Sequence, residues 1–304
     1  MSREIELIGA AWGLGGADPA CAQAPRVLMP QLAARLADCG ARVVLGPTLE
    51  PDGAERRKQA QVSRLCARLA ATVAGSVRAG RLPCVLGGDH SCAGGTWTGV
   101  ARGLAPGALG LVWVDAHMDS HTPATSHTGR LHGMPLAWLL GEDDHALYGL
   151  SAGVVAPADV ALVGVRSYEP EEAARLEQLA VRVFHMEEVE RRGLPAVFAE
   201  ALAIAMARTA RFGVSIDLDA VTPDEAPAVG TPVRGGVGGA ELAQALAGLA
   251  ARPQLAALEL VEYSPRLDAD GRTARLAVEA LAAALCRTGD DPQVLADALE
   301  RPDG

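Results

Sequence analysis

Hydrophobic residues follow two alternating patterns along this chain. Short runs are apolar at nearly every position, whereas the alanine-rich stretches between them repeat apolar residues at helical spacing. The short runs predict strands near 4–9, 41–46, 82–87, 109–115, 159–165, 182–184, 212–217 and 256–261. The longer stretches predict helices, most clearly at 54–79, 195–210, 239–251 and 273–287.

This alternation of strands and helices predicts the fold class. Strands that are apolar on both faces and separated by helices are typical of a parallel sheet covered on both sides. We therefore expect an α/β fold with three layers, α/β/α, around a central, mostly parallel sheet. The 304 residues show no internal repeat and no linker, so we expect one domain spanning 1–304, with a short helix and a frayed tail in 288–304.

Composition narrows the possible partners and location. The net charge of −10 argues against nucleic acid and anionic membrane surfaces as partners. The N-terminus lacks the pattern of a signal peptide, and no apolar run is long enough to span a membrane. The six cysteines are scattered and form no CxxC pair, so we expect reduced, mostly buried thiols in a cytoplasmic protein.

Four of the predicted strands run directly into acidic residues or histidines. Asp115, His117 and Asp119 alternate after one strand, and they share a face if the extended conformation continues. In open α/β sheets, ligands bind at the carboxyl ends of the strands, so we expect the polar residues there to converge. The residues at these four strand ends are Asp89, His90, Asp115, His117, Asp119, Asp217, Asp219 and Glu262.

Crowding of this kind indicates a metal site. Taken singly, each residue fits a solvated loop acid or a helix cap, but several buried carboxylates together need compensation by cations. Asp115, Asp119, Asp217 and Asp219 carry four negative charges, which two divalent cations balance. Oxygen ligands with some imidazole favour Mn²⁺ over a zinc site rich in thiolates. Because two adjacent metals can present hydroxide as a nucleophile, the residues predict metal-assisted hydrolysis at a binuclear centre.

Five motifs resemble the ordered signature of the ureohydrolases, the superfamily of arginases and agmatinases, and most closely that of bacterial arginases. They are GGDHS (87–91), DAHMD (115–119), LHG (131–133), SIDLDAVTPDEAPAVGTP (215–232) and VEYSP (261–265). The resemblance extends from the first strand to the last helix. It implies an arginase-like fold, two Mn²⁺ ions per subunit and a homo-oligomer, either a trimer or a hexamer.

The resemblance also implies a ligand set, with Asp115 and Asp217 bridging the two ions. One ion would be held by His90, Asp115, Asp119 and Asp217. The other would be held by Asp115, His117, Asp217 and Asp219.

Two residues match catalytic positions of the family, and the chemistry of the reaction suggests a role for a third. His132 matches a histidine that moves protons, and Glu262 matches the carboxylate that receives the substrate guanidinium. Asp119, beside the attacking hydroxide, would relay a proton to the departing amine.

The substrate pocket is implied by further matches. Glu169 and Glu172 match acids that bind the substrate amino group, although they also suit the start of a helix, and Thr231 matches a pocket threonine. In the carboxylate-binding loop, this chain has His121, Thr128 and Arg130 where arginases typically have asparagine, serine and asparagine. The more basic loop favours a small guanidino substrate that carries a carboxylate.

We therefore expect hydrolysis of L-arginine to L-ornithine and urea. Hydrolysis of agmatine, a guanidino acid or N-hydroxyarginine is the alternative within the same enzyme class. A metal-binding but inactive regulatory homologue, or a binding protein without metal, is the alternative outside it. His127, His145 and His185 match no motif, and we expect them to be surface or packed histidines.

Overall fold

A computed structural model of the chain describes residues 3–53, 57–104, 108–141, 150 and 153–286. In this part, eight strands form one sheet in the order β2-β1-β3-β8-β7-β4-β5-β6, and every neighbouring pair is parallel. The strands are β1 (Ile5–Ala10), β2 (Val43–Leu49), β3 (Leu82–Gly87), β4 (Leu109–Val114), β5 (Val160–Val165), β6 (Arg182–His185), β7 (Arg211–Asp217) and β8 (Leu255–Val261). All eight predicted strands are confirmed.

Nine α-helices lie in the described residues, and the four predicted ones are among them. The helices are α1 (Ala24–Asp38), α2 (Lys58–Arg78), α3 (Ala93–Leu104), α4 (Pro135–Leu139), α5 (Pro170–Gln178), α6 (Met186–Arg192), α7 (Leu194–Met206), α8 (Gly239–Leu246) and α9 (Arg272–Leu285). The predicted helix 239–251 is shorter than expected, because Gly248 adopts a left-handed φ of 73° and separates α8 from a 3-10 turn. The short helix expected in 288–304 lies outside the described residues.

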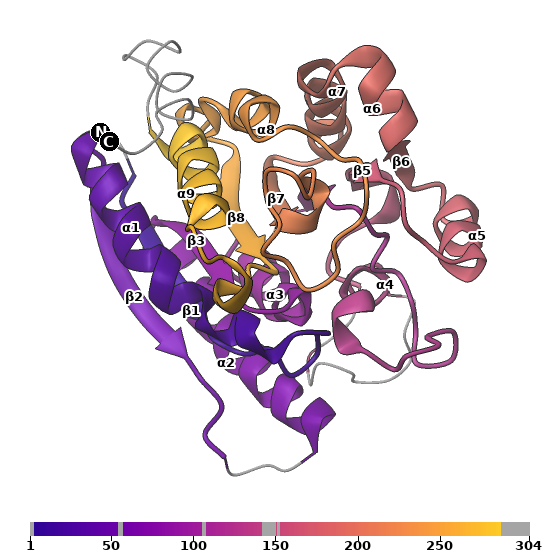
Figure 1. Cartoon of the computed structure of the whole chain (residues 1–304), viewed down its shortest axis with the longest axis horizontal. Coiled ribbons are helices and arrows are strands. Elements are labelled where there is room, and N and C mark those ends of the chain that lie inside the picture. The colour runs from indigo at the N-terminus through magenta and orange to yellow at the C-terminus, as the bar shows by residue number, and fades with distance from the viewer. Residues whose placement is uncertain (1–2, 54–56, 105–107, 142–149, 151–152, 287–304) are drawn as a thin grey trace.

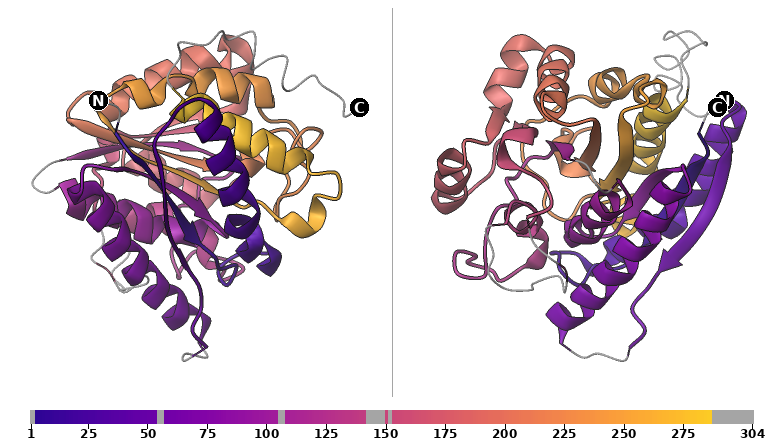
Figure 2. Two further views of the ribbon diagram at one scale, coloured as in Figure 1. Left: turned by 90° about the vertical axis from the view of Figure 1, so that its left-hand side faces the viewer. Right: turned by 180° about the vertical axis from the view of Figure 1, so that it is seen from behind.

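The helices form two layers that enclose the sheet (Figures 1 and 2). Helices α1, α6, α7, α8 and α9 share one hydrophobic core, and α2 to α5 share the other. In β4, Val112 and Val114 pack into the first core while Leu111 and Trp113 pack into the second. This period of two, with both sides apolar, confirms the three-layer prediction.

The strand order determines where the polar strand ends meet. Strands β3, β8, β7 and β4 are direct neighbours at the centre of the sheet. Because all strands run the same way, the residues that follow them share one edge, which we call the carboxyl edge. The opposite edge, where the strands begin, is the amino edge. No helix in the described ranges is long and apolar enough to cross a membrane.

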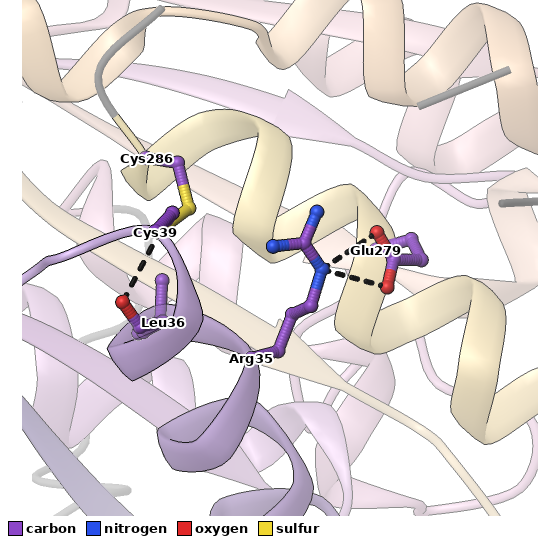
Figure 3. Close-up of a disulfide and its surroundings, with 5 residues drawn as sticks. All are labelled: Arg35, Leu36, Cys39, Glu279 and Cys286. Carbon is purple, nitrogen blue, oxygen red and sulfur yellow. Dashed lines mark hydrogen bonds and ion pairs between the residues drawn. A yellow bond between two sulfur atoms is a disulfide. The ribbon is translucent and has the colours of Figure 1, made fainter. Parts of the chain in front are cut away.

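A disulfide joins the ends of α1 and α9 (Figure 3). Cys39 and Cys286 are 247 residues apart in sequence, but the fold brings their Cα atoms to 6.0 Å. Nearby, Arg35 in α1 donates hydrogen bonds of 3.0 and 3.2 Å to Glu279 in α9. The prediction of reduced thiols is therefore wrong for this pair, because sequence spacing carries no sign of a contact made by two distant helices. The buried free thiols are Cys21, Cys66, Cys84 and Cys92.

Candidate active site

His90 lies at the centre of a first group of carboxylates on the carboxyl edge. Its Nδ1 atom is 3.3 Å from Asp115, 3.0 Å from Asp119 and 3.2 Å from Asp217. All four residues are buried, and His90 Nδ1 has no hydrogen-bond partner among the described residues. The four ligands that the sequence assigns to one metal ion are therefore brought together.

A second group lies beside the first. His117 Nδ1 is 3.5 Å from Asp115 and 3.0 Å from Asp219. Ligand atoms of these three residues lie within 4.8 Å of one another, as do those of His90, Asp115 and Asp217. Asp115 thus belongs to both groups, which is the arrangement that a residue bridging two ions requires.

The backbone conformation that brings these side chains together differs from the extended one considered in the sequence analysis. The condition for the shared face, an extended conformation that continues past the strand, is not met, because β4 ends at Val114 and the chain bends at residues 116 and 117. The Asp115 side chain accepts a 2.7 Å hydrogen bond from the His117 backbone, and Asp119 has a left-handed φ of 47°. A turn, rather than a continued strand, therefore points these side chains the same way.

A buried hydrogen-bond chain holds His90 in place. Glu259, in β8, accepts hydrogen bonds from Ser215 Oγ at 2.8 Å and from Trp97 Nε1 at 3.1 Å. Since the one hydroxyl hydrogen of Ser215 is donated to Glu259, the Ser215 oxygen accepts the 2.9 Å hydrogen bond from His90 Nε2. His90 Nε2 therefore carries the hydrogen, and the lone pair of Nδ1 faces the carboxylates.

Trp113 supports the same group from the other side. Its ring stacks on His90 with centroids 4.2 Å apart, and its Nε1 donates a 2.9 Å hydrogen bond to Asp115. Trp113, Ser215 and Glu259 were missed by sequence reasoning, although two signals were present. Trp113 and Ser215 each precede an aspartate by two residues on a strand, and Glu259 is the one charged residue in β8.

The electrostatics of these groups favour a bound cation. Burial, and then the charges of neighbouring carboxylates, raise the pKa of Asp217 well above its ordinary value and that of Asp119 to about 6. Burial also raises the pKa of Asp219. For Asp115 burial acts in the same direction, but hydrogen bonds from His117 and His90 outweigh it and lower the pKa. The donor set of carboxylate oxygens, two imidazoles and an unpartnered buried Nδ1 fits divalent metal ions.

His132 and Glu262 form a buried pair beside the cluster. His132 Nδ1 is 2.9 Å from Glu262 Oε1, which also accepts a 2.9 Å hydrogen bond from the His90 backbone. Burial opposes protonation of His132, but the charge of Glu262 raises its pKa to about 9. Glu262 Oε2 is buried and has no hydrogen-bond partner among the described residues. Glu262 also has a left-handed φ of 66°.

A cavity of about 160 Å³ opens from the metal-ligand groups. At its buried end lie ligand residues of both groups and His132, and towards solvent lie the exposed Thr128, Arg130 and Glu169. All six residues predicted to bind substrate line the cavity, namely His121, Thr128, Arg130, Glu169, Glu172 and Thr231. His127 also lines the cavity. Sequence reasoning missed this residue because it belongs to none of the five motifs.

Two acids and a histidine meet at one wall of this cavity. His121 Nε2 lies 3.1 Å from Glu169 and 3.4 Å from Glu172. Glu169 and Glu172 also form the capping box that begins α5, which confirms the start of a helix expected at this position. Burial raises the pKa of Glu172 to about 8. On the opposite wall, the Thr231 hydroxyl donates to Asp219 at 3.1 Å.

Two further residues build the loops around the site. Asp89 accepts hydrogen bonds from the backbone of Ser91 and of Gly15, both at 2.9 Å, so it caps a turn. Arg166, after β5, donates to the backbone carbonyls of Asp219 at 2.7 Å and Val233 at 3.1 Å. Sequence reasoning missed Arg166, which ties two site loops together.

Comparisons with known proteins agree with this geometry. The sequence model described as "Arginase family" matches residues 3–286. The arginase of Bacillus caldovelox is 42% identical over 213 residues, which are 69% of this chain and 71% of that protein. The arginase of Agrobacterium fabrum is 33% identical over 293 residues, 90% of this chain and 88% of that protein. The solved structure of Bacillus caldovelox arginase matches with a TM-score of 0.87 and 34% identity, covering 96% of this chain and 99% of that one. This chain therefore belongs to the arginase family, whose members are hydrolases acting on C–N bonds of linear amidines.

Proposed function

We propose that this chain hydrolyses L-arginine to L-ornithine and urea at a binuclear manganese centre. The observation that carries the proposal is one cavity with acidic metal ligands at its buried end and charges of both signs at its mouth. A guanidinium needs the acidic end, and an α-ammonium with an α-carboxylate needs acids beside a cation. Glu169 and Glu172 supply those acids, and Arg130 supplies the cation.

The metal ligands follow from the two groups around Asp115. His90, Asp115, Asp119 and Asp217 would hold one ion, and Asp115, His117, Asp217 and Asp219 the other. When bound, a pair of divalent cations lowers the pKa of water so that it can attack a guanidinium carbon near neutral pH. Carboxylates with two imidazoles suit Mn²⁺.

Glu262 is the residue best suited to bind the guanidinium. One of its oxygens is used by His132 and the His90 backbone, whereas buried Oε2 has no partner among the described residues. An N–H of the substrate would satisfy that oxygen, and the carboxylate charge would offset the guanidinium charge. Gly230 leaves space on this side, since a side chain there would come within 3.5 Å of Oε2.

Proton transfer is assigned to Asp119 and His132. Asp119 lines the cavity beside the other proposed ligands, so its carboxylate is placed to accept a proton and pass it on. The departing amine would take that proton. His132 lines the cavity and is 14% exposed at its side chain, so it can exchange protons with solvent.

A matched panel of substrates tests the proposal. Arginine is compared with agmatine, which lacks the carboxylate, and with 5-guanidinopentanoate, which lacks the amino group. Urea release is measured on enzyme stripped of metal and reloaded with Mn²⁺, with the bound metal counted by mass spectrometry. We expect two ions per chain and a kcat/KM for arginine at least about tenfold above either analogue. No urea from any compound would rule out the hydrolase assignment.

Arg130→Ala sharpens this test. The variant should raise KM for arginine about tenfold with little change in kcat, because it removes uniform binding of the carboxylate. The KM for agmatine should not change, since agmatine has no carboxylate to lose. A parallel rise for both substrates would show that Arg130 acts on the loop rather than on the substrate.

One observation favours a second candidate, a guanidino acid without an amino group. His121 already lies within ion-pair distance of Glu169 and Glu172, so an incoming ammonium must compete with the imidazole. If 5-guanidinopentanoate is the better substrate, this candidate replaces arginine. His121→Asn should then shift the preference towards arginine by about tenfold, and an unchanged preference would exclude His121 as the cause.

Assembly and location are also proposals. The family resemblance supports a homotrimer or homohexamer, which sedimentation of the metal-loaded protein distinguishes. A cytoplasmic location stays a prediction. The disulfide between Cys39 and Cys286 does not support it, because such bonds are rare in reducing compartments.

A further inference from the structure

A second and larger cavity lies at the amino edge of the sheet, at the opposite end from the active site. It has a volume of about 350 Å³ and is formed by the residues before β1 and β2, the start of β7, and the turn at 249–251. The disulfide between Cys39 and Cys286 lies beside it, since Cys39 and Leu285 are part of its wall. Nothing in the arginase chemistry uses this cavity.

The charged residues that line this cavity are all positive. They are Arg3, Arg42 and Arg211, and none of the lining residues, which all belong to the described part of the chain, is acidic. Arg42 lies 3.9 Å from Glu4, with its side chain 55% exposed. Arg211 donates a 2.8 Å hydrogen bond to the carbonyl of Pro253, a neutral partner, and forms no ion pair with an acid among the described residues.

Arg3 has the least favourable surroundings of the three. Its Nη2 atom is buried and has no hydrogen-bond partner among the described residues. Burial, and next to it the charge of Arg211, lower the pKa of Arg3 below its ordinary value. A guanidinium nevertheless stays protonated, so the buried Nη2 of Arg3 lacks an acceptor among the described residues while the like charge of Arg211 repels it.

The acids nearest in sequence already have arginine partners. Glu4 and Glu6 both bind Arg81, at 3.4 and 3.3 Å. The buried Nη2 of Arg3, which has no hydrogen-bond partner among the described residues, and the like charge of Arg211 therefore point to an acceptor that is not part of these strands.

We propose that this cavity binds a small oxyanion, a phosphate or a carboxylate, between Arg3 and Arg211, with Arg42 at the exposed rim. The planar guanidinium fork matches the oxygens of both anions and binds them through charge-assisted hydrogen bonds. The cavity volume is that of a small-molecule site and exceeds the space that a single water needs.

Binding there would connect strands that are not neighbours. Arg3 precedes β1 and Arg211 begins β7, and β3 and β8 lie between these strands in the sheet. An anion held by both would tie the two halves of the amino edge together. We expect it to stabilise the fold without changing the chemistry, since the catalytic residues follow the other ends of the strands.

Thermal unfolding of the metal-loaded protein tests the proposal. Inorganic phosphate and succinate serve as the two probes, against sodium chloride at equal ionic strength, and calorimetric titration gives the affinities. At least one probe should raise Tm by about 2–4 °C at saturating concentration, the shift expected for roughly 1 kcal/mol of binding in a protein of this size. The tighter probe identifies the source of the oxyanion. No rise above chloride with either probe would overturn the proposal.

Substitutions separate binding from a structural role of the arginines. Arg3→Gln and Arg211→Gln should each weaken anion affinity about tenfold, since each removes a charge-assisted contact. In chloride, Arg3→Gln should melt at the same or a higher temperature than the parent, because the repulsion by Arg211 is relieved. In the stabilising anion the order should reverse. Variants that melt lower than the parent in chloride by the same margin as in the anion would overturn the proposal.

A matched control removes one positive charge elsewhere. Arg26→Gln changes an exposed arginine that pairs with Glu50, so it alters net charge without touching the cavity. This variant should keep the full anion response. The kcat/KM for urea release, measured in the same buffers, should stay within about twofold for all three variants. An anion response lost equally in Arg26→Gln would show general screening of charge and overturn the proposal.

Discussion

The two edges of the sheet gather charge of opposite sign in physically different ways. At the carboxyl edge, short aspartate side chains are buried and fixed by backbone N–H groups and Trp113. At the amino edge, long arginine side chains reach a cavity and are only partly buried. Both edges hold like charges close together. The difference is that hydrogen bonds from the backbone and Trp113 hold the charged atoms of the first edge, whereas those of the second edge are carried into the cavity by long side chains.

This difference predicts where substitutions matter. A hard cation needs several oxygens within a few tenths of an ångström, so a rigid cluster fails when one member is lost. We expect an anion site built from several arginines to lose affinity stepwise as each is removed, and to affect stability alone. Effects on catalysis should therefore be large at the carboxyl edge and small at the amino edge.

The largest effect is expected for Asp217→Ala. Asp217 ends β7, and its carboxylate lies 3.2 Å from His90 Nδ1. Its loss should remove at least one metal ion and lower kcat about a thousandfold or more, because the cluster loses a proposed bridging ligand. Metal content and urea release measure this. Asp224→Ala, at an exposed position in the next loop, is the control and should behave like the parent.

If Asp217→Ala keeps its full metal content, the bridging assignment is wrong. The expected contrast, with large effects on catalysis at the carboxyl edge and small ones at the amino edge, would then be unsupported. A lower kcat with full metal content would instead indicate a role in positioning substrate.

His132→Asn is expected to have the next largest effect. Loss of a proton-transfer group typically lowers kcat by about 10² to 10⁴. The variant should also change the pH dependence of stability in the metal-free protein. Glu262 raises the pKa of His132 to about 9, so the pair stabilises the fold fully below the unfolded pKa of about 6.5, and this contribution disappears as pH rises through 9.

Urea denaturation at several pH values measures this contribution. Parent and variant should differ by at most about 3 kcal/mol at pH 6 and converge near pH 10. His185→Asn, a partly buried histidine at the end of edge strand β6, is the control. A difference that grows with pH would mean that the histidine is neutral in the folded protein.

Glu259→Gln is expected to have a smaller effect. Glu259 touches no proposed metal ligand directly, and it acts on His90 through Ser215. An uncharged amide should orient Ser215 less firmly, which lowers metal affinity about 10- to 100-fold with a smaller change in kcat at saturating Mn²⁺. Glu6→Gln, a buried carboxylate in β1 that pairs with Arg81, is the matched control. Equal metal affinity in both variants would exclude Glu259 as a positioning residue.

The smallest effect on catalysis is expected at the amino edge. Reducing the disulfide between Cys39 and Cys286 should lower Tm, since the bond closes a loop of almost the whole described chain. At temperatures where both forms are folded, kcat/KM should stay within about twofold. Cys39→Ser should reproduce the result. A large loss of activity on reduction would break the comparison, because it would couple the two edges.

The sequence predicted those features that depend on one strand and the residues directly after it. Short runs that are apolar at nearly every position predicted every strand of the described chain, and acids after β3, β4, β7 and β8 predicted the edge at which the site lies. Because these strands are parallel neighbours in the sheet, the residues that follow them lie close together. The family motifs then supplied the ligand assignments, which local patterns alone do not give.

Features made by contacts between distant elements escaped prediction. The Ser215–Glu259 bond joins β7 to β8, and the disulfide joins α1 to α9. The arginine cavity combines residues from the starts of three strands, none of which stands out in sequence. The left-handed turn at Asp119 was missed because an alternating pattern favours an extended chain.

That turn also limits how this protein can be engineered. Replacing a left-handed residue by glycine normally relieves strain and raises stability by about 1 kcal/mol. The non-glycine candidates in the described chain are Asp119, Ala180 and Glu262. Two of the three lie in the proposed active site, so a search for thermostable variants that favours glycine there would select proteins that unfold later and hydrolyse nothing. Ala180→Gly, in an exposed turn, offers the same gain without that trade.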